Sequence, residues 1–176
     1  MNIPMPNNQP GAETMNTAIS ILCDEHRSIA AVIKGLLDHV ARVKDGAQAP
    51  DFMLFMSMFD YIETLPEKIH HPKENDYLFR FLRMRDPESA PILDMLEAQH
   101  ESGGELLADL REKLAGYRVT GKLEAFDQAL TAYAEFNWDH MSKEENLVLP
   151  RAEKYLTPAD WEIISAAFAV NRESAC

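Results

Sequence analysis

Residues 123–147, with the sequence LEAFDQALTAYAEFNWDHMSKEENL, decide how this chain folds. One stripe of residues recurs here in alternating steps of three and four: Leu123, Phe126, Leu130, Tyr133, Asn137, His140, Glu144 and Leu147. Such steps keep side chains on one face of an α-helix, whereas a strand would alternate at every second residue. The stretch therefore predicts a bundle helix that carries His140 and Glu144 on its inward face.

Three further segments show a helical pattern. Two of them have regular stripes, which are Ile19, Leu22, His26, Ile29, Ile33, Leu36 and Val40 in one, and Leu93, Leu96, His100, Gly103, Leu107, Leu110 and Leu114 in the other. The segment between them begins with a stripe of Phe52, Phe55, Phe59 and Ile62. Pro66 and Pro72 then interrupt the pattern, and because each removes a backbone donor and crowds the preceding turn, we expect a kink or a local break there.

Short breaks that contain Gly or Pro separate these segments at residues 45–50, 86–91 and 116–121. Short connections favour antiparallel neighbours, so the sequence predicts an all-α, up-down-up-down four-helix bundle. Residues 157–160, with the sequence TPAD, have the N-cap, proline and acid that begin a helix. They predict a short additional C-terminal helix that ends near Val170.

Length and charge limit the classes of protein to consider. Residues 1–15 are expected to form a flexible tail, and residues 16–172 one bundle domain. The 29 acidic residues outnumber the 17 basic ones and give a net charge of −12, which disfavours nucleic acids and membrane surfaces as partners.

The sequence also allows predictions of cellular location and of assembly. It contains no secretory signal and no apolar run of transmembrane length, and its two cysteines form no disulfide framework, so a cytoplasmic protein is expected. Cys23 is interpreted as a packing residue. A homodimer is a candidate assembly, through apolar surface expected near Trp161 and Phe168.

Each helical segment carries one histidine on its inward stripe, and these four are His26, His70, His100 and His140. The other two lie elsewhere: His39 is about 220° around the helix from His26, and His71 is about 100° from His70. Pro72 leaves open whether His71 replaces His70 at the inward face.

Two of the inward histidines share a local motif. His70 and His140 both begin the pattern H-x-x-K-E, which puts Glu74 and Glu144 four residues later on the same helix face. Carboxylates buried without partners are costly, and bound cations would offset that cost. Four imidazoles and two carboxylates suit two metal ions, each with two histidines, bridged by the two glutamates. Nitrogen and oxygen donors without thiolate favour iron, with manganese and zinc as rivals.

A ferritin-like centre is the alternative arrangement of ligands. Such centres use Glu-x-x-His on two helices and one Glu on each of the others. The pairs Glu67–His70 and Glu97–His100 match that spacing, but Asn137 stands where the last helix should carry its Glu. This alternative is therefore second. The remaining acids, including Glu25, Glu101 and Glu145, are expected mostly on the solvated surface, although an acid beside a ligand histidine would orient it.

Together, D-E-H at His26, H-H-P-K-E at His70, Q-H-E at His100 and H-M-S-K-E-E at His140 resemble the hemerythrin-like (HHE) cation-binding family. The resemblance covers roughly residues 20–156. It implies a four-helix bundle with a non-haem di-iron centre in its core. By position, it implies metal ligation by His26, His70, Glu74, His100, His140 and Glu144.

The chain differs from oxygen-carrying hemerythrins at Gly104, where those proteins carry a further histidine. Losing that imidazole is expected to open a coordination position with space beside it. The resulting H-x-x-x-G motif is similar to that of hemerythrin-like iron–sulfur repair and nitric-oxide-response proteins, but their cysteine-bearing N-terminal domain is absent here. Tyr77 and Tyr133 lie seven residues from His70 and His140, and are interpreted as core residues or as groups near the open position.

The resemblance implies a di-iron protein that binds or reacts with O2, NO or peroxide, or handles iron, in sensing, storage or repair. Whether it is an enzyme is left open, because the sequence contains no recognisable nucleophile or phosphate-binding loop. The alternative is an interaction module stabilised by zinc or manganese, without redox chemistry.

Overall fold

The computed structural model describes residues 10–170, which contain helices and no strand. The α-helices are α1 (Pro10–Lys44), α2 (Phe52–Ile62), α3 (His71–Lys73), α4 (Arg80–Arg85), α5 (Ala90–Thr120), α6 (Glu124–Lys143), α7 (Leu149–Tyr155) and α8 (Pro158–Ala169). Wide π-helical turns form η1 (Glu63–His70), η2 (Glu74–Phe79) and η4 (Glu144–Val148), and η3 (Pro87–Ser89) is a 3₁₀ turn. The predicted all-α class is confirmed.

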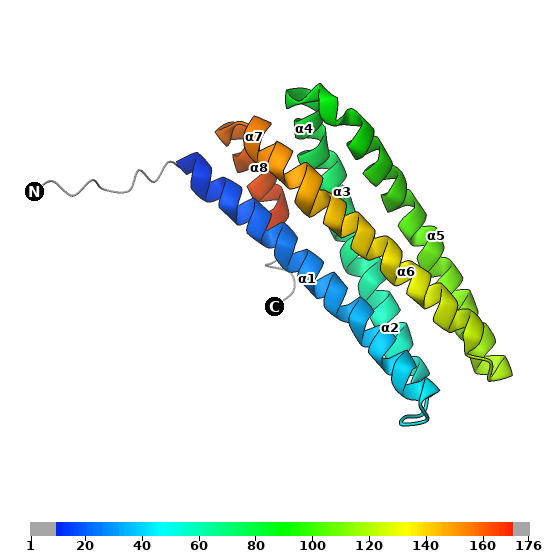
Figure 1. The fold of residues 1–176 in the computed structure, drawn as a ribbon. Coiled ribbons are helices and arrows are strands. Elements are labelled where there is room, and N and C mark those ends of the chain that lie inside the picture. Colours follow the sequence, from blue (N-terminus) through cyan, green and yellow to red (C-terminus); the bar gives the residue numbers. More distant parts are fainter. Residues whose placement is uncertain (1–9, 171–176) are drawn as a thin grey trace, which may run out of the picture.

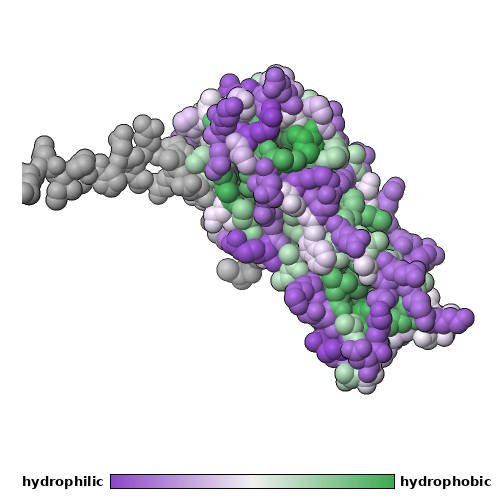
Figure 2. All heavy atoms as spheres, in the orientation of Figure 1, coloured by the Kyte–Doolittle hydropathy of each residue, from purple (hydrophilic) through white to green (hydrophobic). Residues whose placement is uncertain are grey.

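Four long helical stretches lie side by side along the molecule: α1, the stretch from α2 to α4, α5, and α6 with its continuation α7 (Figure 1). The shorter α8 packs against α1. Polar residues cover much of the face drawn in Figure 2, with apolar areas interspersed. None of the helices between residues 10 and 170 combines the length and apolar character that a membrane span requires.

Two separate apolar cores fill the interior. The core next to α8 includes Leu22, Leu78, Leu96, Val148 and Trp161, and the core toward the α1–α2 loop includes Ile33, Ile62, Leu107, Phe126 and Leu130. On every long helical stretch, the inward histidine falls between a residue of one core and a residue of the other. The predicted stripes are therefore core faces interrupted at one level by polar residues.

The chain between Pro66 and Pro72 does not break. It stays helical from Phe52 to Arg85, and Pro66 lies inside the π-helical turn η1. A proline lacks the N–H that an α-helix uses, and a π-helical turn re-spaces the backbone hydrogen bonds around it. The expected distortion is real, but it takes the form of wide turns rather than an interruption.

The predicted break at residues 116–121 was wrong for most of its length. Helix α5 continues to Thr120, and buried Tyr117 lies within this last part. The turn comes at Gly121, whose φ of 71° is a left-handed conformation that glycine adopts without strain. Burial of Tyr117 outweighs the modest helix penalty of Gly116.

The first helix begins earlier than the expected start of the bundle domain at residue 16. Helix α1 begins at Pro10, so residues 10–15, assigned above to the tail, are helical, while residues 1–9, 171 and 172 lie outside the described part. Trp161 and Phe168 themselves are buried in the core, at 3% and 1% exposure, whereas their neighbours Ile163, on the outer side of α8, and Val170, just after this helix, are exposed. Cys23 packs against that core, as predicted.

The start of α8 follows the predicted capping pattern and supports one prediction. Asp160 accepts hydrogen bonds from the Arg85 guanidinium and from the Thr157 backbone, and these contacts lower its pKa to about 2. Replacing Asp160 with asparagine is expected to lower the free energy of unfolding by about 1–2 kcal/mol at neutral pH. The value is measured by urea denaturation.

The pH dependence follows from the sign of that shift. Because the pKa of Asp160 is lower in the folded chain than its ordinary 3.8, its contribution is complete above that value and is lost as the pH falls toward 2. The difference between wild type and variant should shrink over this range. Exposed Glu162 on the same helix is the control, and Glu162→Gln should change stability by less than about 0.5 kcal/mol. Equal losses in both variants would contradict the assigned contacts.

Candidate metal centre

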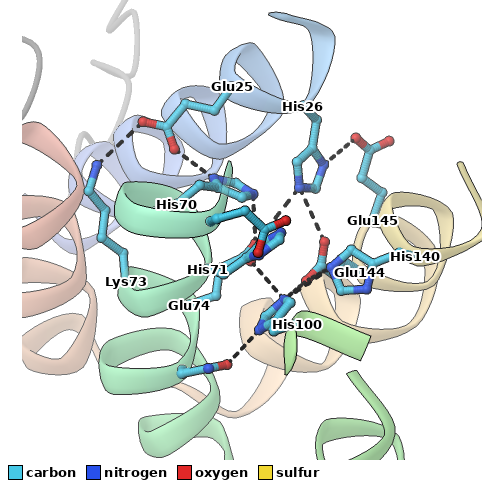
Figure 3. A network of polar contacts seen from close by, with 12 residues as sticks. Glu25, His26, His70, His71, Lys73, Glu74, His100, His140, Glu144 and Glu145 are labelled. Atoms are coloured by element: carbon cyan, nitrogen blue, oxygen red, sulfur yellow. Dashed lines mark hydrogen bonds and ion pairs between the residues drawn. The ribbon is translucent and has the colours of Figure 1, made fainter. Parts of the chain in front are cut away.

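All six residues predicted as metal ligands meet at one level of the interior (Figure 3). They are His26 from α1, His70 from η1, Glu74 from η2, His100 from α5, His140 from α6 and Glu144 from η4. All six are buried, and both glutamates are completely so. Residues far apart in the sequence thus form one polar cluster between the two apolar cores.

The imidazole Nε2 atoms surround the two carboxylates. Glu74 lies 3.2 Å from His70 Nε2 and 3.4 Å from His100 Nε2. Glu144 lies 3.2 Å from His26 Nε2 and 3.3 Å from His140 Nε2. His26 also reaches Glu74 at 3.7 Å, so the contacts connect the two carboxylates through shared histidines.

The other nitrogen of each of these four imidazoles has an acceptor on a different helix. The Nδ1–acceptor pairs are His26–Glu145 (2.9 Å), His70–Glu25 (2.7 Å), His100–Asn75 (2.8 Å) and His140–Gln99 (3.0 Å). A neutral imidazole that donates from Nδ1 keeps the Nε2 lone pair free for a metal. The partners therefore fix both the orientation and the tautomer that ligation requires.

The sequence predicted only part of this outer set. An acid beside a ligand histidine was expected to orient it, which holds for Glu25 and Glu145, but Asn75 and Gln99 were not identified. Each of the four is the chain neighbour of a site residue, yet each contacts a histidine on another helix. Glu145, for example, follows Glu144 and contacts His26.

The contacts of the imidazoles with the two central carboxylates are ion-pair contacts without hydrogen-bond geometry. Both oxygens of Glu74, both oxygens of Glu144 and Nε2 of His26 are buried without a hydrogen-bond partner. Buried unpartnered carboxylates are unfavourable, and native proteins normally pair them or use them to coordinate metals. The set therefore fits bound cations, with nitrogen and oxygen donors suited to iron, manganese or zinc.

The acid–base properties of the cluster agree with this. Burial lowers the pKa of His26, but its contacts with Glu144 and Glu74 outweigh burial and raise that pKa to about 11. The pKa of His100 is raised to about 9 in the same way. The neighbouring imidazoles lower the pKa of Glu74 against the effect of burial. The centre thus stabilises positive charge strongly, and a bound cation would replace these protons.

The candidate ligand atoms divide into two groups that share Glu74. One group is His26, His70, Glu74 and Glu144, and the other is His71, Glu74, His100 and His140. Within each group all ligand atoms lie within 4.8 Å of one another. This separation allows one cation per group, with Glu74 between the two.

His71 is the site residue that the sequence analysis placed wrongly. It was expected about 100° away from the inward face, or in place of His70, but both side chains point inward. The His71 ring stacks on His100, with centroids 4.0 Å apart and an interplanar angle of 10°. A π-helical turn holds more residues than an α-helical one, so the regular helix phase fails here. The only sequence signal was the pair of prolines, Pro66 and Pro72.

The space expected beside Gly104 is partly filled by Glu67. Its Oε2 lies 3.9 Å from where a Cβ on Gly104 would stand, and its Oε1 lies 2.9 Å from the corresponding position on Gly103. Only glycine at position 103 permits this approach. Of the two tyrosines, Tyr77 is partly exposed, whereas Tyr133 is buried with its hydroxyl unpartnered. Burial, together with the charge of Glu67, raises the pKa of Tyr133.

The ferritin-like alternative does not match these contacts. Glu97 accepts a hydrogen bond from Arg83 at 2.9 Å and belongs to neither ligand group. Asn137 donates a hydrogen bond to the backbone oxygen of Tyr133 and belongs to neither ligand group. The carboxylates that do converge are Glu74 and Glu144, from the two H-x-x-K-E motifs.

Comparison with known proteins gives one match. The family described as the hemerythrin HHE cation binding domain matches residues 17–152, which include every member of both ligand groups. Neither the curated proteins nor the solved structures gave a match to the chain.

Proposed function

The chain belongs to the hemerythrin HHE cation-binding family, and from this premise we propose that it is a non-haem di-iron protein. Its ligands would be His26, His70, Glu74, His100, His140 and Glu144, and the four long stretches would run up-down-up-down around them. It would bind or react with O2, NO or peroxide, or handle iron. The observation that carries this proposal is the pair of ligand groups that share Glu74, a fully buried carboxylate without a hydrogen-bond partner.

Iron in these groups would supply redox chemistry and coordination positions for a small ligand. The chain itself would provide orientation and exclusion of water. Glu25, Glu145, Asn75 and Gln99 hold the histidine rings in place through Nδ1, and such outer partners also tune the properties of a metal. The two apolar cores close the centre on both sides along the bundle.

A second candidate is a zinc or manganese module without redox chemistry. The donor set is compatible with this candidate, because imidazole and carboxylate without thiolate also suit zinc and manganese. In that case the metals would serve to hold the four helical stretches together.

One experiment separates these candidates. Protein from iron-sufficient cells is analysed for metals, and its absorption spectrum is recorded first anaerobically and then in air. About two irons per chain and a visible band that responds to air support the di-iron proposal. A colourless zinc form supports the second candidate, and protein without metal contradicts both. His140→Ala should lose most of the metal, whereas His39→Gln should keep it, because His39 is buried outside both groups and contacts the α1–α2 loop.

A further inference from the structure

We infer that His71 is a fifth imidazole ligand, so that the two metal positions are unequal. One position would have His26 and His70 with Glu74 and Glu144, and the other would have three imidazoles with Glu74. The inference rests on the proposed function, because it concerns the same centre. Helix phase alone had placed His71 away from the inward face, about 100° from His70.

His71 is buried with a ring nitrogen that has no hydrogen-bond partner. Only 8% of the residue is exposed, and its Nδ1 has no hydrogen-bond partner. The nearest carboxylate oxygen, Oε2 of Glu67, is 3.7 Å away, beyond hydrogen-bond distance. Buried polar atoms are normally paired, as those of His39 are with Gln48 and Asp51. The buried Nδ1 of His71 thus lacks a hydrogen-bond partner among the described residues, which is unusual for a ring that is not a ligand.

His71 also lies close to the other candidate ligands of its group. A ring nitrogen of His71 lies within 4.8 Å of ligand atoms of Glu74, His100 and His140. Its ring centroid lies 4.0 Å from that of His100 and 5.5 Å from that of His140. Glu144 Oε1 lies 3.3 Å from His140 Nε2 and 3.6 Å from His100 Nε2, so without His71 this position would have two imidazoles and two carboxylates, and His71 would add a third imidazole to it.

Helix α5 has two glycines where it could have carried a second histidine. This helix presents Gly103 and Gly104 near the centre instead of a second histidine, and the carboxylate of Glu67 occupies the space above them. Glu67 and His71 lie four residues apart on the helical stretch that faces these glycines. The π-helical turn thus lets one stretch supply both His70 and His71, which replaces an imidazole that α5 does not provide.

The experiment is a titration of the metal-free protein with cobalt(II), followed by visible absorption. His71→Phe keeps an aromatic ring to stack on His100 but removes the donor nitrogen, and His71→Gln is the second variant in case the first fails to fold. Each is expected to bind one cobalt as wild type does and the second at least about tenfold more weakly. His100→Phe serves as the reference for loss of a ligand from the same group.

Two outcomes would overturn the inference. If His71→Phe takes two cobalt ions with the affinity and spectrum of wild type, His71 only packs against His100. On the cobalt-loaded wild type, five hyperfine-shifted imidazole N–H resonances support five ligands, and four contradict them; this count needs no variant. Failure of wild type to bind cobalt at all would instead contradict the proposed function itself.

Discussion

Replacing Glu74 with glutamine is expected to reduce the metal content from about two ions per chain to nearly none. Glu74 belongs to both ligand groups and lies within 3.7 Å of Nε2 of His26, His70 and His100. The amide has nearly the same shape, but it lacks the charge and is a weak ligand. Metal analysis of protein from iron-sufficient cells measures the loss.

The controls for this prediction are two other glutamates near the centre. Glu101 follows His100 in the sequence but is exposed, so Glu101→Gln should retain the metal. Glu145 contacts only the outer nitrogen of His26, and Glu145→Gln should weaken binding by about 10–100-fold. Removing one member of a buried charge cluster can itself destabilise the fold, so circular dichroism of the metal-free Glu74 variant is the check that the loss of metal is not a loss of folding. If the Glu74 variant keeps two ions, Glu74 does not link the groups.

Helix periodicity predicted most of the fold and most of the candidate site for the same reason. In α1, α5 and α6 the backbone is regular α-helix at the inward histidine, so His26, His100 and His140 follow the phase of the apolar residues around them. Because the apolar residues before and after each histidine on the stripe are buried, the histidine between them must be buried as well. The charge of buried side chains then indicates a cation.

The phase argument failed where the backbone leaves the α-helix. Pro66 removes one hydrogen-bond donor, and the chain can respond with a break, a kink or a wide turn. Which of these forms depends on packing against the neighbouring helices, and that packing is not encoded in the local pattern. The result here is η1, which turns His71 inward beside His70.

Two outer partners of the histidines, Asn75 and Gln99, could not be predicted from the sequence for another reason. Asn75 contacts His100 and Gln99 contacts His140, although each is adjacent in sequence to a different site residue. Such contacts depend on which helices are neighbours and on how far each is shifted along the bundle axis relative to the other. A sequence pattern gives the face of one helix but not the register between two.

Apolar packing away from the metal centre gives the other large expected effect. Replacing Phe126 with alanine is expected to lower the free energy of unfolding by about 3–5 kcal/mol. The side chain is fully buried, and its ring lies 5.2 Å from Phe55, 6.2 Å from Phe59 and 6.4 Å from Tyr117 between centroids. Because α2, α5 and α6 meet at this ring, the cavity would weaken three helices at once. Urea denaturation of metal-free protein measures the change.

The control for this variant lies on the same helix. Trp138 is 43% exposed, so Trp138→Ala should cost less than about 1 kcal/mol although it removes a larger side chain. Phe126 belongs to the core toward the α1–α2 loop and to neither ligand group, so folded Phe126→Ala protein should bind as many cobalt ions as wild type. A loss below 1 kcal/mol for Phe126→Ala would mean that this core closes around the gap. A loss of metal at unchanged stability would mean that Phe126 acts on the centre rather than on the fold.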